Sequence, residues 1–212
     1  MSIAAVIFDL GGVVLGSPLQ AFAAYERELG LPIHTLNKGI VAAGAAGAWA
    51  RLERGELTMR EFYSAFDAEN AARGVTISTE ILMANVARNT DVRVEVVAAL
   101  RLLRLNGLKV AALTNNWVSE DQSKKMSQLR TEFDVFIEST RVGLRKPDRR
   151  IYELTCRELG LEPERVAYLD DIGLNLKPAR ALGMTTIKVD DIAVALRELS
   201  EVVGFSLAIE RA

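Results

Sequence analysis

A short apolar segment near the N-terminus constrains the fold of this chain more than any other feature. Residues 4–8 are apolar, Asp9 follows them directly, and the glycine pair Gly11 and Gly12 comes next after one leucine. A continuous run this short, with glycines beyond it, predicts a strand that is buried on both faces of a parallel sheet. Reactive groups collect at the carboxyl ends of such strands. Taken alone, however, Asp9 is better explained as the N-cap of a following helix, so its role depends on the rest of the chain.

The second half of the chain alternates strands with helices. Short apolar runs that predict strands occupy residues 108–113, 135–137, 166–169 and 185–189. Helical patterns occupy residues 91–105, 148–159, 175–182 and 192–203, and another begins at the capping sequence 119–122. This alternation predicts right-handed crossovers and a mostly parallel sheet with helices on both faces. The expected fold class is α/β, a Rossmann-like doubly wound sheet.

Residues 16–90 differ from everything downstream, because they contain helical patterns and no convincing strand. Capping boxes begin helices at Ser17, with Pro18 at the first helical position, and at Thr58. We therefore expect a helical insertion at residues 16–90 and a core formed by residues 1–15 and 91–212.

The composition argues against several classes of function. A formal net charge of −2 gives no reason to expect binding to nucleic acid or to a membrane surface. The N-terminal segment lacks the pattern of a signal peptide, and no stretch is apolar enough to span a bilayer, so a cytoplasmic location is expected. The single cysteine, Cys156, excludes an internal disulfide and is expected in the core, and the sole histidine, His34, excludes a multi-histidine metal site.

Polar side chains stand at the ends of four predicted strands. They are Asp9, Thr114, Asn115, Lys146, Asp170 and Asp171. Crowded carboxylates need a cation or a proton, and oxygen ligands favour a hard ion such as magnesium. With a lysine, a hydroxyl and backbone N–H groups, such an ion can hold a phosphoryl group, and a carboxylate can attack its phosphorus. Each residue alone has a simpler explanation as a cap, a surface ion pair or a turn, but together they predict a phosphoryl-transfer site.

The order and spacing of these motifs resemble the haloacid dehalogenase-like hydrolase superfamily. The matching segments are FDLGGV at 8–13, LTNN at 113–116, RKPDRRIY at 145–152 and LDD at 169–171 with Asn175 and Ala179. The resemblance covers nearly the whole chain. Within the superfamily, the chain is most similar to the branch that contains the phosphatase domain of soluble epoxide hydrolases and bacterial sugar-phosphate phosphatases. The resemblance implies that residues 16–90 form a cap, for which the segment 54–62 is typical.

The resemblance also implies a metal site. Asp9 would be both the nucleophile and a ligand of Mg²⁺. The backbone carbonyl of Gly11 and the pair Asp170 and Asp171 would complete the protein ligands, with Asp171 the more direct of the two. Gly11 is also expected beside the bound substrate.

The phosphoryl group would be held by the other matched residues. The resemblance gives this task to the hydroxyl of Thr114 and the backbone N–H of Asn115, while Lys146 would neutralise the charge shared by nucleophile and phosphate. Substrate specificity would come from the cap. Its candidate pocket residues are Trp49, Arg51 and Arg54. For these three, a packed aromatic ring and a solvated helix face are at least as good explanations.

One position departs from the family pattern, which usually has a second aspartate two residues after the nucleophile. In the family, that aspartate serves as general acid and then as general base. In this chain, the corresponding position is occupied by Gly11. Such assistance is typically worth about a hundred- to ten-thousand-fold in rate. Esters with poor leaving groups should therefore be slowed most.

Three functions remain open from the sequence. The first is a magnesium-dependent phosphatase that acts on a small phosphorylated metabolite. The second is a catalytically weak or inactive descendant that binds a phosphate ligand or a protein partner, and Gly11 favours it. The third is a haloacid dehalogenase, which needs no divalent metal, and the pair Asp170 and Asp171 argues against it. The sequence identifies neither the substrate nor a protein partner.

Overall fold

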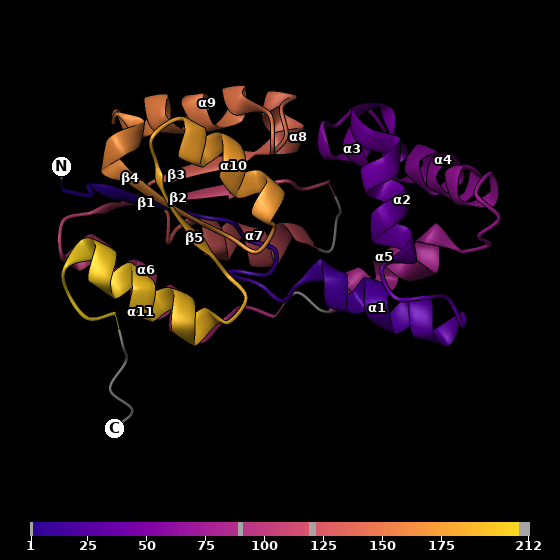
Figure 1. The fold of residues 1–212 in the computed structure, drawn as a ribbon, viewed down its shortest axis with the longest axis horizontal. Coiled ribbons are helices and arrows are strands. Elements are labelled where there is room, and N and C mark those ends of the chain that lie inside the picture. Colours follow the sequence, from indigo (N-terminus) through magenta and orange to yellow (C-terminus); the bar gives the residue numbers. More distant parts are fainter. Residues whose placement is uncertain (1, 89–90, 119–121, 208–212) are drawn as a thin grey trace.

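The computed structural model describes residues 2–88, 91–118 and 122–207. Its centre is a sheet of five parallel strands in the order β3-β2-β1-β4-β5 (Figure 1). They are β1 (Ala5–Phe8), β2 (Lys109–Thr114), β3 (Val135–Glu138), β4 (Val166–Asp170) and β5 (Thr185–Lys188). The predicted Rossmann-like α/β sheet is confirmed.

Helices cover both faces of this sheet (Figure 1). On one face α6 (Val94–Leu105), α7 (Gln122–Arg130) and α11 (Ile192–Val203) pack on strand residues such as Val6 and Phe8. On the other face α9 (Arg149–Leu159) and α10 (Gly173–Ala181) pack on Ala5 and Ile7. Because successive side chains of β1 point to opposite faces, four consecutive apolar residues serve both cores. Cys156 lies buried in the second core, as expected.

Five helices between the first two strands form a separate unit with its own core. They are α1 (Pro18–Glu28), α2 (Thr35–Ala43), α3 (Ala48–Glu53), α4 (Met59–Ala71) and α5 (Thr79–Arg88), with a 3₁₀ turn at Gly44–Ala46. We call α1 to α5 the helical unit. Its core is aromatic, with Trp49 in edge contact with Phe22, Phe62 and Phe66. The unit lies beyond one end of the sheet (Figure 1), and no strand forms among its described residues.

The two connections between the helical unit and the sheet run side by side. Leu15 forms an antiparallel bridge with Val92, and Arg93 N donates to Val14 O at 2.9 Å. The helix predicted for residues 91–105 therefore begins only at Val94, because the backbone before it is used in this pairing. Among the described residues, the two chain segments are thus paired with each other where they pass between the helical unit and the sheet.

Two further sequence expectations meet the structure at helix starts. The capping box at Thr58 is confirmed, since its hydroxyl accepts from Glu61 N while Glu61 accepts from Thr58 N. The capping box at Ser17 is wrong: Ser17 is the N-cap of α1, but its hydroxyl donates to Asp171 Oδ2 at 3.3 Å. The first helix of the unit is thus tied to a strand end of the sheet.

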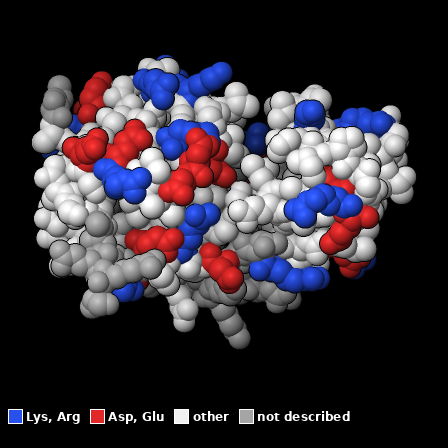
Figure 2. Space-filling view, turned by 60° about the horizontal axis from the view of Figure 1, so that its bottom comes forward, with Lys and Arg blue, Asp and Glu red and all other residues white. Residues whose placement is uncertain are grey.

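Charged side chains of both signs share the one face of the molecule that is drawn in space-filling form, and the two signs are interspersed there (Figure 2). Among the helices in the described ranges, none combines the length and the apolar character needed to cross a membrane.

Candidate active site

The strand ends bring the predicted residues to one edge of the sheet. Phe8 pairs in register with Leu169 of β4 and with Ala112 of β2, and Asp9 N donates to Leu169 O at 2.9 Å. Asp9 therefore lies beside the ends of both neighbouring strands. The next helix after Asp9 begins at Pro18 with Ser17 as its N-cap, so the helix-cap interpretation of Asp9 is wrong.

Lys146 lies at the centre of the carboxylates. Its Nζ is 2.8 Å from Asp9 Oδ1 and 2.7 Å from Asp170 Oδ2, and its side chain is only 1% exposed. Burial opposes the charge on Lys146, but the carboxylates of Asp170 and Asp9 outweigh it and raise the lysine pKa. Lys146 is therefore a fixed positive charge against the candidate nucleophile. The sequence predicted Lys146 at the end of a strand. In the structure the short helix α8 (Ser139–Val142) lies between β3 and Lys146, so the lysine does not follow the strand directly.

Asp170 is fully occupied by donors from the protein. Its Oδ2 accepts from Lys146 and from the hydroxyl of Tyr168, and its Oδ1 accepts from Ile172 N at 2.7 Å and Asn175 Nδ2 at 3.0 Å. A carboxylate held in this way is a rigid anchor for Lys146. It is a poorer metal ligand than a carboxylate with an oxygen left over.

Asp171 has such an oxygen. Its Oδ1 is buried and has no hydrogen-bond partner among the described residues. Carboxylate oxygens of Asp9, Asp170 and Asp171 lie within 4.8 Å of one another. Burial, with the charge of Asp170, raises the pKa of Asp171 to about 6. A buried, unpaired carboxylate oxygen is costly unless something satisfies it, and a hard divalent cation such as Mg²⁺ suits this all-oxygen set.

The nucleophile candidate shows the same need for positive charge. Burial raises the pKa of Asp9 well above its usual range; Lys146 opposes this, and Asp170 and Asp171 add to it. Lys146 is in direct contact with two of these three acidic groups, Asp9 and Asp170. The residues present fit a divalent cation next to Asp9.

Gly12 keeps the backbone open for Asp171. Gly12 has φ +84°, and a Cβ on it would lie 2.1 Å from Asp171 Oδ2. Both the left-handed backbone and the contact require glycine. The second glycine of the N-terminal motif is explained by this carboxylate.

Asn115 has a role that the sequence did not reveal. Its side-chain oxygen accepts from Lys146 N at 2.8 Å, and its amide nitrogen donates to Lys146 O at 3.0 Å. The asparagine thus fixes the peptide units on both sides of the Lys146 Cα. Thr114 is buried at the end of β2, and among the described residues its hydroxyl makes only a long contact of 3.4 Å to Asn115 O.

A cavity of about 410 Å³ lies over these residues. Its walls come from the sheet edge, including Asp9, Gly11, Asn115, Lys146 and Asp171, and from the helical unit, including Trp49 and Glu53. Trp49 was predicted as a pocket residue and lines this cavity. Arg51 and Arg54 instead form ion pairs with Glu56 on the surface.

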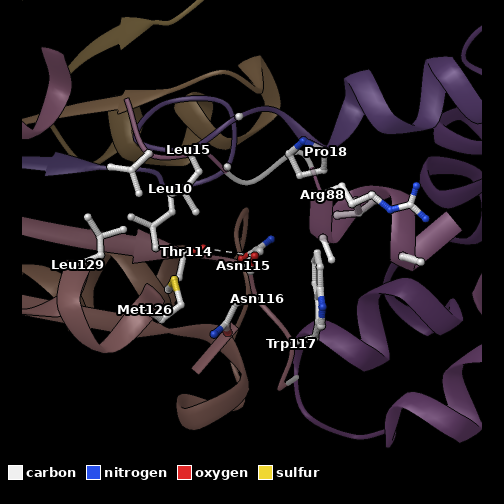
Figure 3. Close-up of a pocket in the computed structure, with 16 residues that line it drawn as sticks. Leu10, Leu15, Pro18, Arg88, Thr114, Asn115, Asn116, Trp117, Met126 and Leu129 are labelled. Carbon is white, nitrogen blue, oxygen red and sulfur yellow. Dashed lines mark hydrogen bonds between the residues drawn. The ribbon is translucent and has the colours of Figure 1, made fainter. Parts of the chain in front are cut away.

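A second cavity, of about 520 Å³, adjoins the first and is mainly apolar. Figure 3 shows Leu10, Met126 and Leu129 on its core side and Trp117 on the side of the helical unit, with Thr114 and Asn115 between them. Gly11, Pro18, Asn115 and Trp117 line both cavities. Both spaces therefore meet at the strand ends.

Comparison with known proteins agrees with this arrangement. The family model for haloacid dehalogenase-like hydrolase matches residues 3–183. Acyl-CoA dehydrogenase family member 10 of Mus musculus is 36% identical over 96% of this chain, and bifunctional epoxide hydrolase 2 of Sus scrofa is 36% identical over 98% of it. The chain spans only 19% and 40% of the lengths of these two relatives. A phosphatase of Mycobacterium tuberculosis is 29% identical, and the match covers 90% of this chain and 88% of the length of that phosphatase.

The fold is also that of solved structures. A HAD-family enzyme of Bacteroides thetaiotaomicron, crystallised in complex with magnesium and inorganic phosphate, superposes with a TM-score of 0.61. The match covers 88% of this chain and 94% of that one at 19% identity.

Proposed function

The chain belongs to the haloacid dehalogenase-like hydrolases, and on that basis we propose that it is a magnesium-dependent phosphatase of a small phosphorylated metabolite. The observation that carries the proposal is the buried unpaired oxygen of Asp171 beside the pair of Asp9 and Lys146. A phosphatase needs a nucleophile, a fixed positive charge and a place for a cation, and these three residues supply them.

Asp9 is the proposed nucleophile. Its Oδ1 is held by Leu10 N at 2.7 Å and by Lys146 Nζ at 2.8 Å, which fixes the carboxylate with its other oxygen available for attack on phosphorus. Attack forms an aspartyl-phosphate and releases the alcohol, and water then hydrolyses the acyl phosphate. Lys146 compensates negative charge on the transferring group throughout.

The remaining strand ends hold the phosphoryl oxygens. Thr114 contributes its hydroxyl, whose one contact with the described part of the chain is long, and Asn115 contributes its backbone N–H. Asp9, Asp171 and the carbonyl of Gly11 are the residues that would hold Mg²⁺. When bound, the ion supplies electrostatic stabilisation to the nucleophile and the phosphoryl group.

The leaving group is proposed to have an apolar part. Leu10, Leu15, Met126, Leu129 and Trp117 line the second cavity directly beside Gly11 and Thr114. Because Gly11 cannot donate a proton from a side chain, an acidic leaving group is also favoured. Aryl phosphates meet both requirements, so they are suitable first substrates.

The helical unit is proposed to act as a cap over the site, comprising residues 16–90, with the core formed by residues 1–15 and 91–212. Both walls of the 410 Å³ cavity are needed to enclose a substrate, and one of them belongs to the unit. The paired crossing at Leu15 and Val92 is the proposed hinge. Closure excludes water until hydrolysis is due, and opening releases the products.

A screen of phosphate esters on the full chain tests the function. Phosphate release is measured with Mg²⁺ and after exhaustive chelation, and halide release from 2-haloacids is measured in parallel. We expect phosphate release that requires Mg²⁺. Metal-independent halide release without phosphatase activity would instead identify a dehalogenase, and no turnover at all would favour a ligand-binding descendant.

A further inference from the structure

Glu53 is a buried carboxylate to which the proposed reaction gives no task. It is the last residue of α3, and its side chain is 8% exposed. Its Oε1 accepts from the indole N–H of Trp49 at 2.9 Å. Its Oε2 lies 2.5 Å from Arg145 Nε and 3.3 Å from Asn115 Nδ2. Glu53 belongs to the helical unit, and its side chain thus forms hydrogen bonds with two residues of the core, Arg145 and Asn115.

These two residues are the ones that place Lys146. Arg145 precedes it in the chain, and the Asn115 side chain is bonded to its peptide N–H and C=O. Of the two core partners of Glu53, Arg145 is therefore adjacent to Lys146 in the sequence, and Asn115 is hydrogen-bonded to the Lys146 backbone. The other end of Lys146 touches Asp9 and Asp170.

We propose that Glu53 is a positioning residue that couples closure of the cap to the placement of Lys146. The proposal rests on the proposed function, because it assumes that Lys146 compensates phosphoryl charge. When the cap is closed, Glu53 orients Arg145 and Asn115, and these hold the lysine backbone. When the cap opens, both core residues lose this acceptor.

The charge of Glu53 explains why it is paired in this way. A lone carboxylate on the wall of a cavity for a phosphate ester would repel the substrate. Arg145 neutralises it at 2.5 Å, so the cavity keeps no excess negative charge from the cap. Removing one partner of a buried pair leaves the other charge uncompensated, which makes the closed state sensitive to either residue.

The chain contains a natural reporter for this contact. Its two tryptophans are Trp49, which donates to Glu53, and Trp117, which follows the β2 strand end. Their ring centroids are 5.8 Å apart in an edge arrangement across the junction between cap and core. Intrinsic fluorescence therefore reports cap closure independently of turnover.

The test compares Glu53→Ala and Glu53→Gln with Glu56→Gln in the full chain. Glu56 is a matched control, because it follows α3 by three residues and pairs with Arg54 at the surface. With an aryl phosphate and Mg²⁺, we expect kcat of Glu53→Ala to fall on the order of ten- to a hundredfold, the effect of a catalytic group that is slightly misplaced. The KM should change far less, and Glu56→Gln should match the wild type.

Two further measurements separate positioning from general damage. In a double-mutant cycle with Arg145→Ala, the double variant should fall little further than Glu53→Ala alone, because the residues act as a pair. The wild-type fluorescence change on adding Mg²⁺ and inorganic phosphate should be lost in Glu53→Ala. If Glu53→Ala does not fold, Glu53→Gln, which keeps the side-chain volume, decides the question.

Wild-type kcat and an unchanged fluorescence response in the Glu53 variants would overturn the proposal, as would additive losses in the cycle. Failure of the proposed function looks different. In that case the wild type itself releases no phosphate, while its fluorescence response and the loss of that response in Glu53→Ala still test the coupling.

Discussion

The ring of Pro18 covers the position where a side chain on Gly11 would begin. A Cβ on Gly11 would lie 3.3 Å from Pro18 Cδ and 3.5 Å from its Cγ. The backbone of Gly11 is outside the left-handed region, so its conformation would accept another residue. The space where a second aspartate would begin at position 11 is therefore bordered closely by Pro18, the first residue of α1.

This pairing predicts a strong dependence of rate on the leaving group. Without a side-chain acid, the leaving oxygen departs as an anion or takes a proton from water. In the wild type, kcat/KM for aryl phosphates should rise steeply with the acidity of the phenol, and primary alkyl phosphates should be poor. A flat dependence would show that another group supplies the proton.

Gly11→Asp should restore the acid and flatten this dependence, with the largest gain for the poorest leaving groups. Because the contact with Pro18 is tight, we expect a larger gain in Gly11→Asp combined with Pro18→Ala. Gly11→Ala is the control for the added Cβ alone. Circular dichroism and Mg²⁺ affinity are measured first, since the Gly11 carbonyl is a proposed ligand. Equal gains for good and poor leaving groups would contradict a role as general acid.

Gly12→Ala should damage the metal site in particular. Its Cβ would lie 2.1 Å from Asp171 Oδ2, whereas Gly30, with φ +66°, has no atom within 4 Å of a Cβ among the described residues. Both substitutions carry backbone strain of about 1–2 kcal/mol, so Gly30→Ala is a matched control. Calorimetric titration should show weakened Mg²⁺ binding only in Gly12→Ala. Equal Mg²⁺ affinity in the two variants would contradict the assignment of Asp171.

Asp171 also predicts a pH-dependent effect of Mg²⁺ on stability. Its pKa in the folded metal-free protein is raised to about 6 from a usual value of 3.8. Without metal, Asp171 keeps its proton up to about pH 6 in the folded state but only up to about pH 3.8 in the unfolded chain. The stability that this protonated carboxyl contributes is therefore complete below about pH 3.8 and is lost as the pH rises through about 6. Added Mg²⁺ should raise the melting temperature more at about pH 7.5 than at about pH 5, because a protonated carboxyl is a poor ligand. A shift independent of pH, or retained in Asp171→Asn, would contradict this.

Cys156 should be unreactive in the folded protein. It is buried among core residues of α9, and burial together with nearby glutamates raises the pKa of its thiol to about 11. Since the thiolate is the reactive form, alkylation by iodoacetamide at about pH 8 should be far slower than in urea. Equal rates in the folded and unfolded chain would mean that the second core is open to solvent.

The sequence predicted those parts of the structure that depend on local pattern. The continuous apolar run of β1 predicted a strand covered on both sides, and such a strand places Asp9 at the sheet edge. The strand ends also brought Thr114 and Asp170 to that edge, because parallel strands share their direction. The capping box at Thr58 was also predictable, because its two partners, Thr58 and Glu61, are only three residues apart in the sequence.

The parts that were missed depend on distant contacts. Ser17 has the local signature of a capping residue, yet its hydroxyl reaches Asp171, which lies more than a hundred and fifty residues away in the chain. Glu53 looks like an ordinary charge near a helix end, and only the packing of α3 on the core places it against Arg145. The different tasks of Asp170 and Asp171 follow from Tyr168, Ile172 and Asn175, whose side-chain and backbone directions no local pattern reveals.

The central claim is that Asp9 attacks phosphorus with Lys146 beside it. The most direct test is an acid-quenched single turnover with Mg²⁺ and an aryl phosphate, followed by borohydride reduction and mass spectrometry of the peptide that contains Asp9. We predict that Asp9 is recovered as homoserine in the wild type, weakly in Lys146→Met, and not at all in Asp9→Asn, an isosteric variant that should keep the fold. Phosphate release at the wild-type rate from Asp9→Asn, or modification at another residue, would contradict the account.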